Sequence, residues 1–161
     1  MAKTFSELEQ DHRELSELLV QHQIALTELD LDRALRLLAQ FDREIRAHAA
    51  WEDKELLPIY EKRAEPTHVG DPAILRAEHH KIEGHLDLFR ARVQQLDPDD
   101  PDLRRRVIAV IDDQRIFKQV LKHHAEREEK TLYPILDDLC TEEERRRILA
   151  KLPRHQEEGT E

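Results

Sequence analysis

The stretch HAAWEDKELLPI, residues 48–59, recurs 76 residues later as HAEREEKTLYPI, residues 124–135, with seven of twelve positions identical. A shorter match precedes each copy, between DHREL at 11–15 and EHHKI at 78–82. Each half of the chain therefore carries a histidine, then a His-x-x-x-Glu followed by Leu-x-Pro. A repeat that keeps histidines and glutamates as well as leucines predicts two related helical hairpins that build one paired site.

Four long amphipathic segments surround these motifs, and we expect helices at about 4–29, 32–63, 72–96 and 102–139. Thr4 with Glu7 predicts a capping box at the first helix, and Thr141 with Glu144 predicts another that opens a short fifth helix at about 142–152. Pro58 is expected to kink or end the second helix.

The loops between these helices are short, so consecutive helices should run antiparallel. The sequence thus predicts an all-α fold, an up-down-up-down four-helix bundle with a short fifth C-terminal helix. We expect a single domain over residues 1–161, with the bundle at about 4–139 and a mobile tail at 153–161.

Composition narrows the function classes. The 161 residues carry a formal net charge of −10, which disfavours nucleic acid and anionic membranes as partners. No apolar run approaches the length of a membrane span, and the N-terminus has no apolar signal segment, so a cytoplasmic location is expected. The one cysteine, Cys140, excludes an internal disulfide and a cysteine-ligated metal site.

Polar side chains occupy positions where the apolar seam of each helix requires a core leucine. On the first helix, steps of three and four residues lead from Leu8 through His12 to Leu15. Residues i and i+4 share a helical face, so the histidine and glutamate of each motif project together. The residues on the four seams are His12, His48, Glu52, His79, His124 and Glu128, and Glu83, one turn after His79, borders its seam.

Burying these imidazoles and carboxylates costs several kcal/mol for each uncompensated charge. Two divalent or trivalent cations would neutralise them, with carboxylates bridging and imidazoles bound at the ends. A single exposed His-x-x-x-Glu pair is common on helices, but six such residues in register and related by a repeat predict metal binding. Ferritin-type bundles use Glu-x-x-His, so this site should have a different geometry.

The remaining candidates are expected to be structural. His80, His85 and His123 fall off the seams and are interpreted as surface residues, and His22 as a residue at the end of the bundle. Tyr133 could approach the site, but it is expected to be an ordinary packed tyrosine.

From about residue 4 to 139 the chain resembles the hemerythrin-like family, also called the HHE cation-binding domain. His12 in Asp-His-x-x-Leu, Glu78-His79 and the two His-x-x-x-Glu motifs with Leu-x-Pro carry the resemblance. It implies a non-haem centre of two iron ions, oxo- or hydroxo-bridged. By the family's pattern Glu52 and Glu128 would bridge the irons. His12 and His48 would hold one iron, and His79 and His124 the other.

The third helix departs from the oxygen-carrying members, which have His-x-x-x-His where this chain has His79 and Glu83. The fourth helix has glutamate at a spacing of four, where the carriers have aspartate at five. A ligating Glu83 would favour the ferric state, and a non-ligating Glu83 would leave an extra open position. Either alternative puts reversible oxygen carriage in doubt.

The leading functional prediction is a di-iron protein that binds or senses O₂ or a related small oxidant, with a diatomic molecule or peroxide as its ligand. Enzymatic removal of peroxide or NO at the same centre is one alternative. Iron handling, including repair of damaged iron–sulfur proteins, is another, although the repair proteins have an extra N-terminal segment with a cysteine. A bundle that is purely structural or binds zinc is the remaining possibility.

Overall fold

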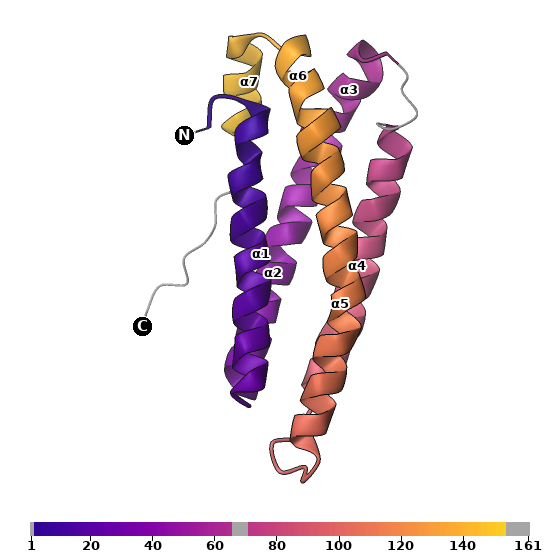
Figure 1. The fold of residues 1–161 in the computed structure, drawn as a ribbon. Coiled ribbons are helices and arrows are strands. Elements are labelled where there is room, and N and C mark those ends of the chain that lie inside the picture. Colours follow the sequence, from indigo (N-terminus) through magenta and orange to yellow (C-terminus); the bar gives the residue numbers. More distant parts are fainter. Residues whose placement is uncertain (1, 66–70, 154–161) are drawn as a thin grey trace.

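The computed structural model describes residues 2–65 and 71–153, and every regular element in these ranges is helical (Figure 1). Residues 154–161 of the expected mobile tail and the histidines at 68 and 155 lie outside the described residues. A 3-10 turn, Phe5–Leu8, leads into α1, Glu9–Thr27. The next helices are α2 (Leu31–Trp51), continued as α3 (Leu57–Arg63); α4 (Pro72–Gln94); α5 (Leu103–Arg127), continued as α6 (Tyr133–Leu139); and α7 (Glu142–Leu149).

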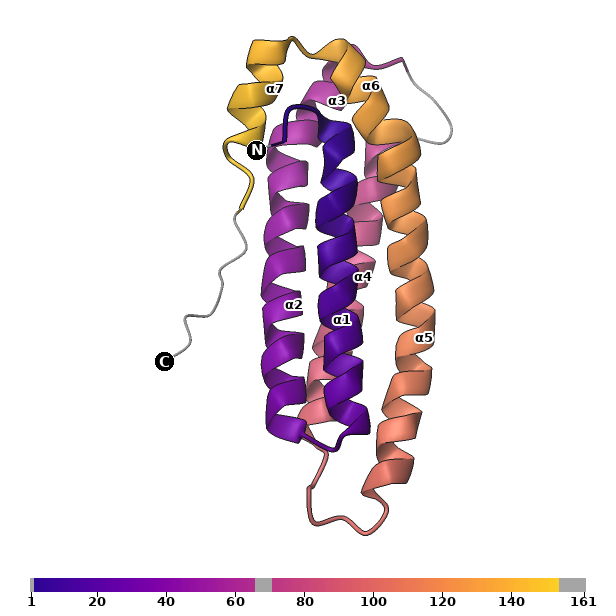
Figure 2. The same cartoon turned by 60° about the vertical axis from the view of Figure 1, so that its left-hand side comes forward.

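The helices form an antiparallel bundle in which α1 packs on α2, α2 on α4, α4 on α5, and α5 on α1 (Figures 1 and 2). The short helix α7 folds back over one end, where the indole Nε1 of Trp51 donates a 3.3 Å hydrogen bond to the carbonyl of Ile148. The predicted all-α bundle with a short fifth helix is confirmed. None of the helices in the described part of the chain is long and apolar enough to cross a membrane.

Helix starts are fixed by side chains that accept hydrogen bonds from backbone N–H groups. Thr141 caps α7 as predicted, because its hydroxyl accepts from the N–H of Glu144 at 3.2 Å. The capping box predicted at Thr4 is wrong, since Thr4 makes no side-chain cap bond. Instead, the carboxylate of Asp137 in α6 accepts a 2.6 Å hydrogen bond from the N–H of Phe5. A tertiary contact therefore holds this helix start.

The two long helices that carry the repeat do not stop at their prolines. Each widens into a π turn, Glu52–Leu56 and Glu128–Leu132, and then continues. Pro58 and Pro134 have no N–H, and their rings clash with the carbonyl four residues earlier. A hydrogen bond five residues back, from Leu57 N–H to the Glu52 carbonyl and from Tyr133 N–H to the Glu128 carbonyl, widens each helix just before its proline and makes room for the ring. Each π turn begins at the glutamate of the motif.

The apolar core is divided into two clusters along the bundle axis. On α1 and the turn before it, Leu8 belongs to one cluster and Leu15 to the other, and on α4 Leu75 and Ile82 divide in the same way. The seam histidines lie between these leucines and isoleucines. The fold therefore holds a polar layer between two apolar layers, which keep bulk water away from it.

Candidate metal centre

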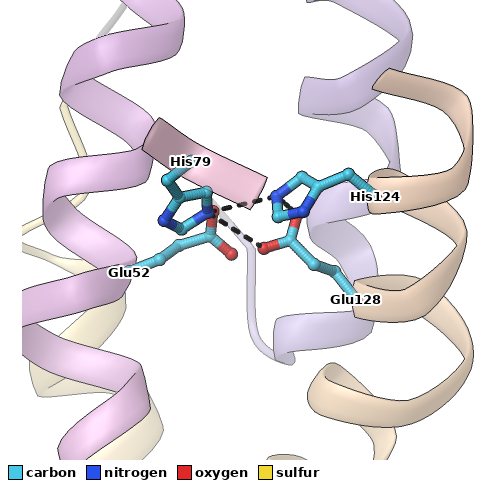
Figure 3. Close-up of side chains that lie close together, drawn as sticks. All are labelled: Glu52, His79, His124 and Glu128. Atoms are coloured by element: carbon cyan, nitrogen blue, oxygen red, sulfur yellow. Dashed lines mark hydrogen bonds and ion pairs between the residues drawn. The ribbon is translucent and has the colours of Figure 1, made fainter. Parts of the chain in front are cut away.

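The structure brings six of the predicted residues into two groups that share one carboxylate. Glu52, His79, His124 and Glu128 form the first group, drawn in Figure 3, and His12, His48 and Glu128 form the second. Within each group the potential ligand atoms all lie within 4.8 Å of one another. Two buried His/Glu groups with Glu128 in common indicate a binuclear metal site.

The ligand atoms are spaced as neighbours around an ion would be. His48 Nε2 lies 3.2 Å from Glu52 Oε1, and His12 Nε2 lies 3.2 Å from Glu128 Oε1. His124 Nε2 lies 3.3 Å from the same Glu128 oxygen. Glu128 therefore contacts imidazoles from both groups, and it is the side chain placed to bridge them.

The chemistry of these donors fits a cation. Glu52 and Glu128 are each 1% exposed, yet Glu52 Oε1 and Glu128 Oε2 have no hydrogen-bond partner among the described residues. A buried carboxylate oxygen without a donor is costly, and a bound cation removes that cost. Imidazole nitrogens and carboxylate oxygens suit iron, zinc and manganese, and the absence of a sulfur donor in the groups excludes a thiolate site.

The protonation of the metal-free centre follows from burial and from its mixed charges. Burial and the negative charge of Glu128 raise the pKa of Glu52. Burial also works against ionisation of Glu128, but His124, Glu52 and His12 hold its pKa well below the usual range. Burial opposes the charge of His12, yet its bond to Glu128 raises the pKa of His12 to about 9. A metal must therefore displace protons to bind here.

Three of the imidazoles are anchored from behind by carboxylates. The Nδ1–H of His12 donates to Glu129 at 2.8 Å, that of His79 to Asp53 at 2.8 Å, and that of His124 to Glu78 at 2.6 Å. A carboxylate at Nδ1 fixes the tautomer that leaves the Nε2 lone pair free for a metal. Sequence reasoning missed these anchors, although Asp53 and Glu129 occupy equivalent places in the repeat.

The hydroxyl of Tyr133 also lies in the centre. It donates to Glu52 Oε2 at 2.9 Å and lies 3.1 Å from Nε2 of His12 and 3.4 Å from Nε2 of His48. The ring is 0% exposed, and burial with the charges of Glu128 and Glu52 raises the pKa of its phenol well above the usual range. The interpretation of Tyr133 as an ordinary packed residue was wrong.

Glu83 lies outside both groups. Its side chain is 37% exposed, and its carboxylate is 3.8 Å from Nδ1 of the exposed His80. Its role as a metal ligand stays a prediction.

The other histidines divide into surface and packed residues. His80 and His123 are exposed, as expected. His85 was expected at the surface, but it is half-buried, with its ring centroid 5.6 Å from that of Phe117. His22 is fully buried, and its Nδ1 donates to the carbonyl of Ala34 at 2.7 Å.

A cavity of about 470 Å³ adjoins the polar layer, and all six ligands of the two groups contribute to its lining. Most of its remaining wall is apolar, including Leu15, Phe41 and Leu121. The lining extends to exposed residues of α1 and α5, among them Arg13 and Lys122. A small molecule could pass from this side of the bundle to the buried carboxylates.

Comparisons with known proteins agree with the residue pattern. The family model of the hemerythrin HHE cation-binding domain matches residues 4–136, which run from before α1 into α6 and contain both His/Glu groups. Searches of curated proteins and of solved structures gave no match. The chain belongs to the hemerythrin HHE cation-binding family.

Proposed function

We propose that this chain holds two iron ions and uses the pair to bind or sense O₂ or a related small oxidant. The observation that carries the proposal is the position of Glu128, which is shared by two groups of buried nitrogen and oxygen donors. Glu52 supports it, because its carboxylate contacts His48 of one group at 3.2 Å and His79 of the other at 3.7 Å. Carboxylate-bridged iron pairs in helix bundles use this donor chemistry.

The chain's own residues would set the properties of the pair. When bound, the two ferrous ions would supply electrons to the oxidant. Glu52 and Glu128 would offset the charge of the cations, and the carboxylates behind His12, His79 and His124 would hold the imidazoles in the binding tautomer. The apolar clusters on both sides of the centre would exclude water from it.

The cavity supports a small ligand that arrives from solvent. Its lining joins exposed residues of α1 and α5 to the two buried carboxylates, Glu52 and Glu128. A sensing role would also need a separate protein that responds to the occupied centre, and the cytoplasm is the location we propose for both.

Iron loading followed by exposure to air tests the proposal. We expect two irons per chain, and visible bands of an oxo-bridged ferric pair that bleach on anaerobic reduction and return with O₂. Protein that binds no iron, or that binds iron without these bands, would contradict it. Turnover separates the enzymatic alternative, because oxygen release from peroxide that is lost in Glu52→Ala would indicate peroxide removal instead of binding.

A further inference from the structure

The two metal groups are unequal in their number of donors. The first contains Glu52, His79, His124 and Glu128, whereas the second contains only His12, His48 and Glu128. The phenol oxygen of Tyr133 lies beside this smaller group. It is 3.1 Å from Nε2 of His12 and 3.4 Å from Nε2 of His48, the two imidazole nitrogens of that group.

These separations are close to those among the ligand atoms themselves. The contacts between histidine and glutamate ligands in the two groups include several of 3.2–3.3 Å, and the two imidazole nitrogens of the first group are 3.1 Å apart. Ligands about 2.1 Å from an octahedral metal are about 3 Å from their cis neighbours. The Tyr133 oxygen therefore occupies a place that a ligand atom would occupy around an ion between His12 and His48.

The internal repeat shows that this oxygen is specific to one half of the centre. Tyr133 corresponds to Leu57 in the first copy, and leucine has no ligand atom. Tyr133 is the first residue after the π turn at 128–132, so the extra residue of that turn sets the direction in which the ring points. Adding Tyr133 to the second group gives it four donors, as many as the first.

We propose that Tyr133 is a metal ligand, and that its phenolate oxygen completes the group of His12, His48 and Glu128. The inference rests on the proposed iron centre. On binding, an oxygen–iron bond forms and the phenol O–H bond breaks. The proton is released to solvent, and no electron is transferred in this step. A hard phenolate would favour the ferric state of the iron that it binds, as a hard anionic donor does.

The ferric protein provides a direct spectroscopic test that does not depend on turnover. We expect a visible phenolate-to-iron charge-transfer band, with tyrosine ring modes enhanced in the resonance Raman spectrum when excitation falls in that band. In Tyr133→Phe the band and the ring modes should vanish while two irons per chain remain. The substitution removes one hydroxyl and keeps the ring that packs in the core, and circular dichroism checks the fold.

Tyr60→Phe is the matched control. Tyr60 is also buried, at 3% exposure, and its hydroxyl has no hydrogen-bond partner among the described residues. This variant should keep the phenolate band unchanged. The wild-type spectrum alone is decisive if Tyr133→Phe fails to fold.

Two results would overturn the inference and leave the proposed function standing: a wild-type protein with two irons and no phenolate modes, or a band that survives in Tyr133→Phe. A protein that binds no iron would overturn the proposed function and this inference with it.

Discussion

Three imidazoles of the centre owe their orientation to carboxylates on neighbouring elements. Two of the three bonds cross between the hairpins, because Asp53 in the first anchors His79 in the second, and Glu129 in the second anchors His12 in the first. The side chains of Asp53 and Glu129 are 38% and 26% exposed, so each bond joins a partly exposed carboxylate to an imidazole of the buried polar layer. These two anchors therefore stabilise both the metal site and the contact between hairpins, whereas Glu78 anchors His124 within the second hairpin.

Removing one anchoring charge should weaken metal binding without removing a ligand. In Asp53→Asn we expect metal affinity to fall by about 10- to 100-fold, because the tautomer of His79 is no longer fixed by a carboxylate. Competition with a chelator measures the affinity. Glu83→Gln is the matched control on geometric grounds and should keep the wild-type affinity. A loss of one metal in Glu83→Gln would show instead that Glu83 ligates, as the sequence predicts, and unchanged affinity in Asp53→Asn would contradict the role of the anchor.

The raised pKa of His12 should make the metal-free protein less stable in base. A histidine with a pKa of about 9 when folded and about 6.5 when unfolded binds its proton more tightly in the native state. The resulting stability is fully present below pH 6.5 and is lost as the pH rises through 9. Urea unfolding should show a decrease of up to about 3 kcal/mol over this window.

The same decrease should be smaller in His12→Gln, which has no imidazole to titrate. Metal affinity should change in the opposite direction and rise with pH over the window, since the imidazole must lose its proton to ligate. A metal-free protein whose stability does not fall between pH 6.5 and 9 would contradict the charge assigned to His12.

Residues that occupy a core position could be found from the sequence, and residues that act from the edge of the core could not. His12 and Glu128 stand in a leucine seam, where a polar side chain requires an explanation. Asp53 and Glu129 look like surface charges next to a ligand, and only the fold shows which imidazole each one meets. The sequence suggests that Tyr133 could approach the site, but not that its hydroxyl reaches the ligands, because the π turn before this residue is not visible in α-helical spacing.

At the scale of the element, the two π turns are the main departure from the helices that the sequence predicts. Proline indicates a break, but not whether the chain ends, bends or widens its helix. Here the helix continues for seven residues beyond each π turn, because buried residues such as Leu57 and Leu136 pack the continuation into the apolar cluster at this end of the bundle. The antiparallel pairing of the helices could be predicted from the short loops and the amphipathic seams alone, because it does not depend on the π turns.

Deleting the extra residue of a π turn should be far more harmful than deleting a loop residue. Without Lys130, an exposed residue of the second turn, the turn would close to α-helical spacing, and the ring of Pro134 would clash with the carbonyl four residues before it. We expect a loss of at least about 3 kcal/mol of unfolding free energy in thermal or urea melts, as for proline inside a regular helix. Deletion of Asp99, exposed in the loop between α4 and α5, is the control. Equal stability of the two deletions would contradict the role of the π turn.

At the scale of the whole molecule, the bundle gives a buried centre a path to solvent. The centre lies between two apolar clusters, and the cavity that reaches α1 and α5 passes beside Leu121. Narrowing the cavity should therefore slow ligand arrival without changing the ligands of the metals.

Leu121→Trp should slow the reaction of the reduced, iron-loaded protein with O₂ several-fold in stopped-flow measurements, with iron content unchanged. Ile108→Trp is the control, because Ile108 lies on the same helix at 60% exposure and does not line the cavity. A rate that is equally slow in both variants would indicate a general disturbance of α5 and would contradict the proposed path.

The shared carboxylate is the central feature of the centre, and an anaerobic titration with ferrous ion tests it most directly. The wild-type chain should bind two irons, and Glu128→Gln should lose both. Glu126→Gln, changed two residues earlier at a half-exposed position, should still bind two. A wild-type chain that binds fewer than two irons, or a Glu128→Gln chain that still binds two, would contradict a binuclear centre held together by Glu128.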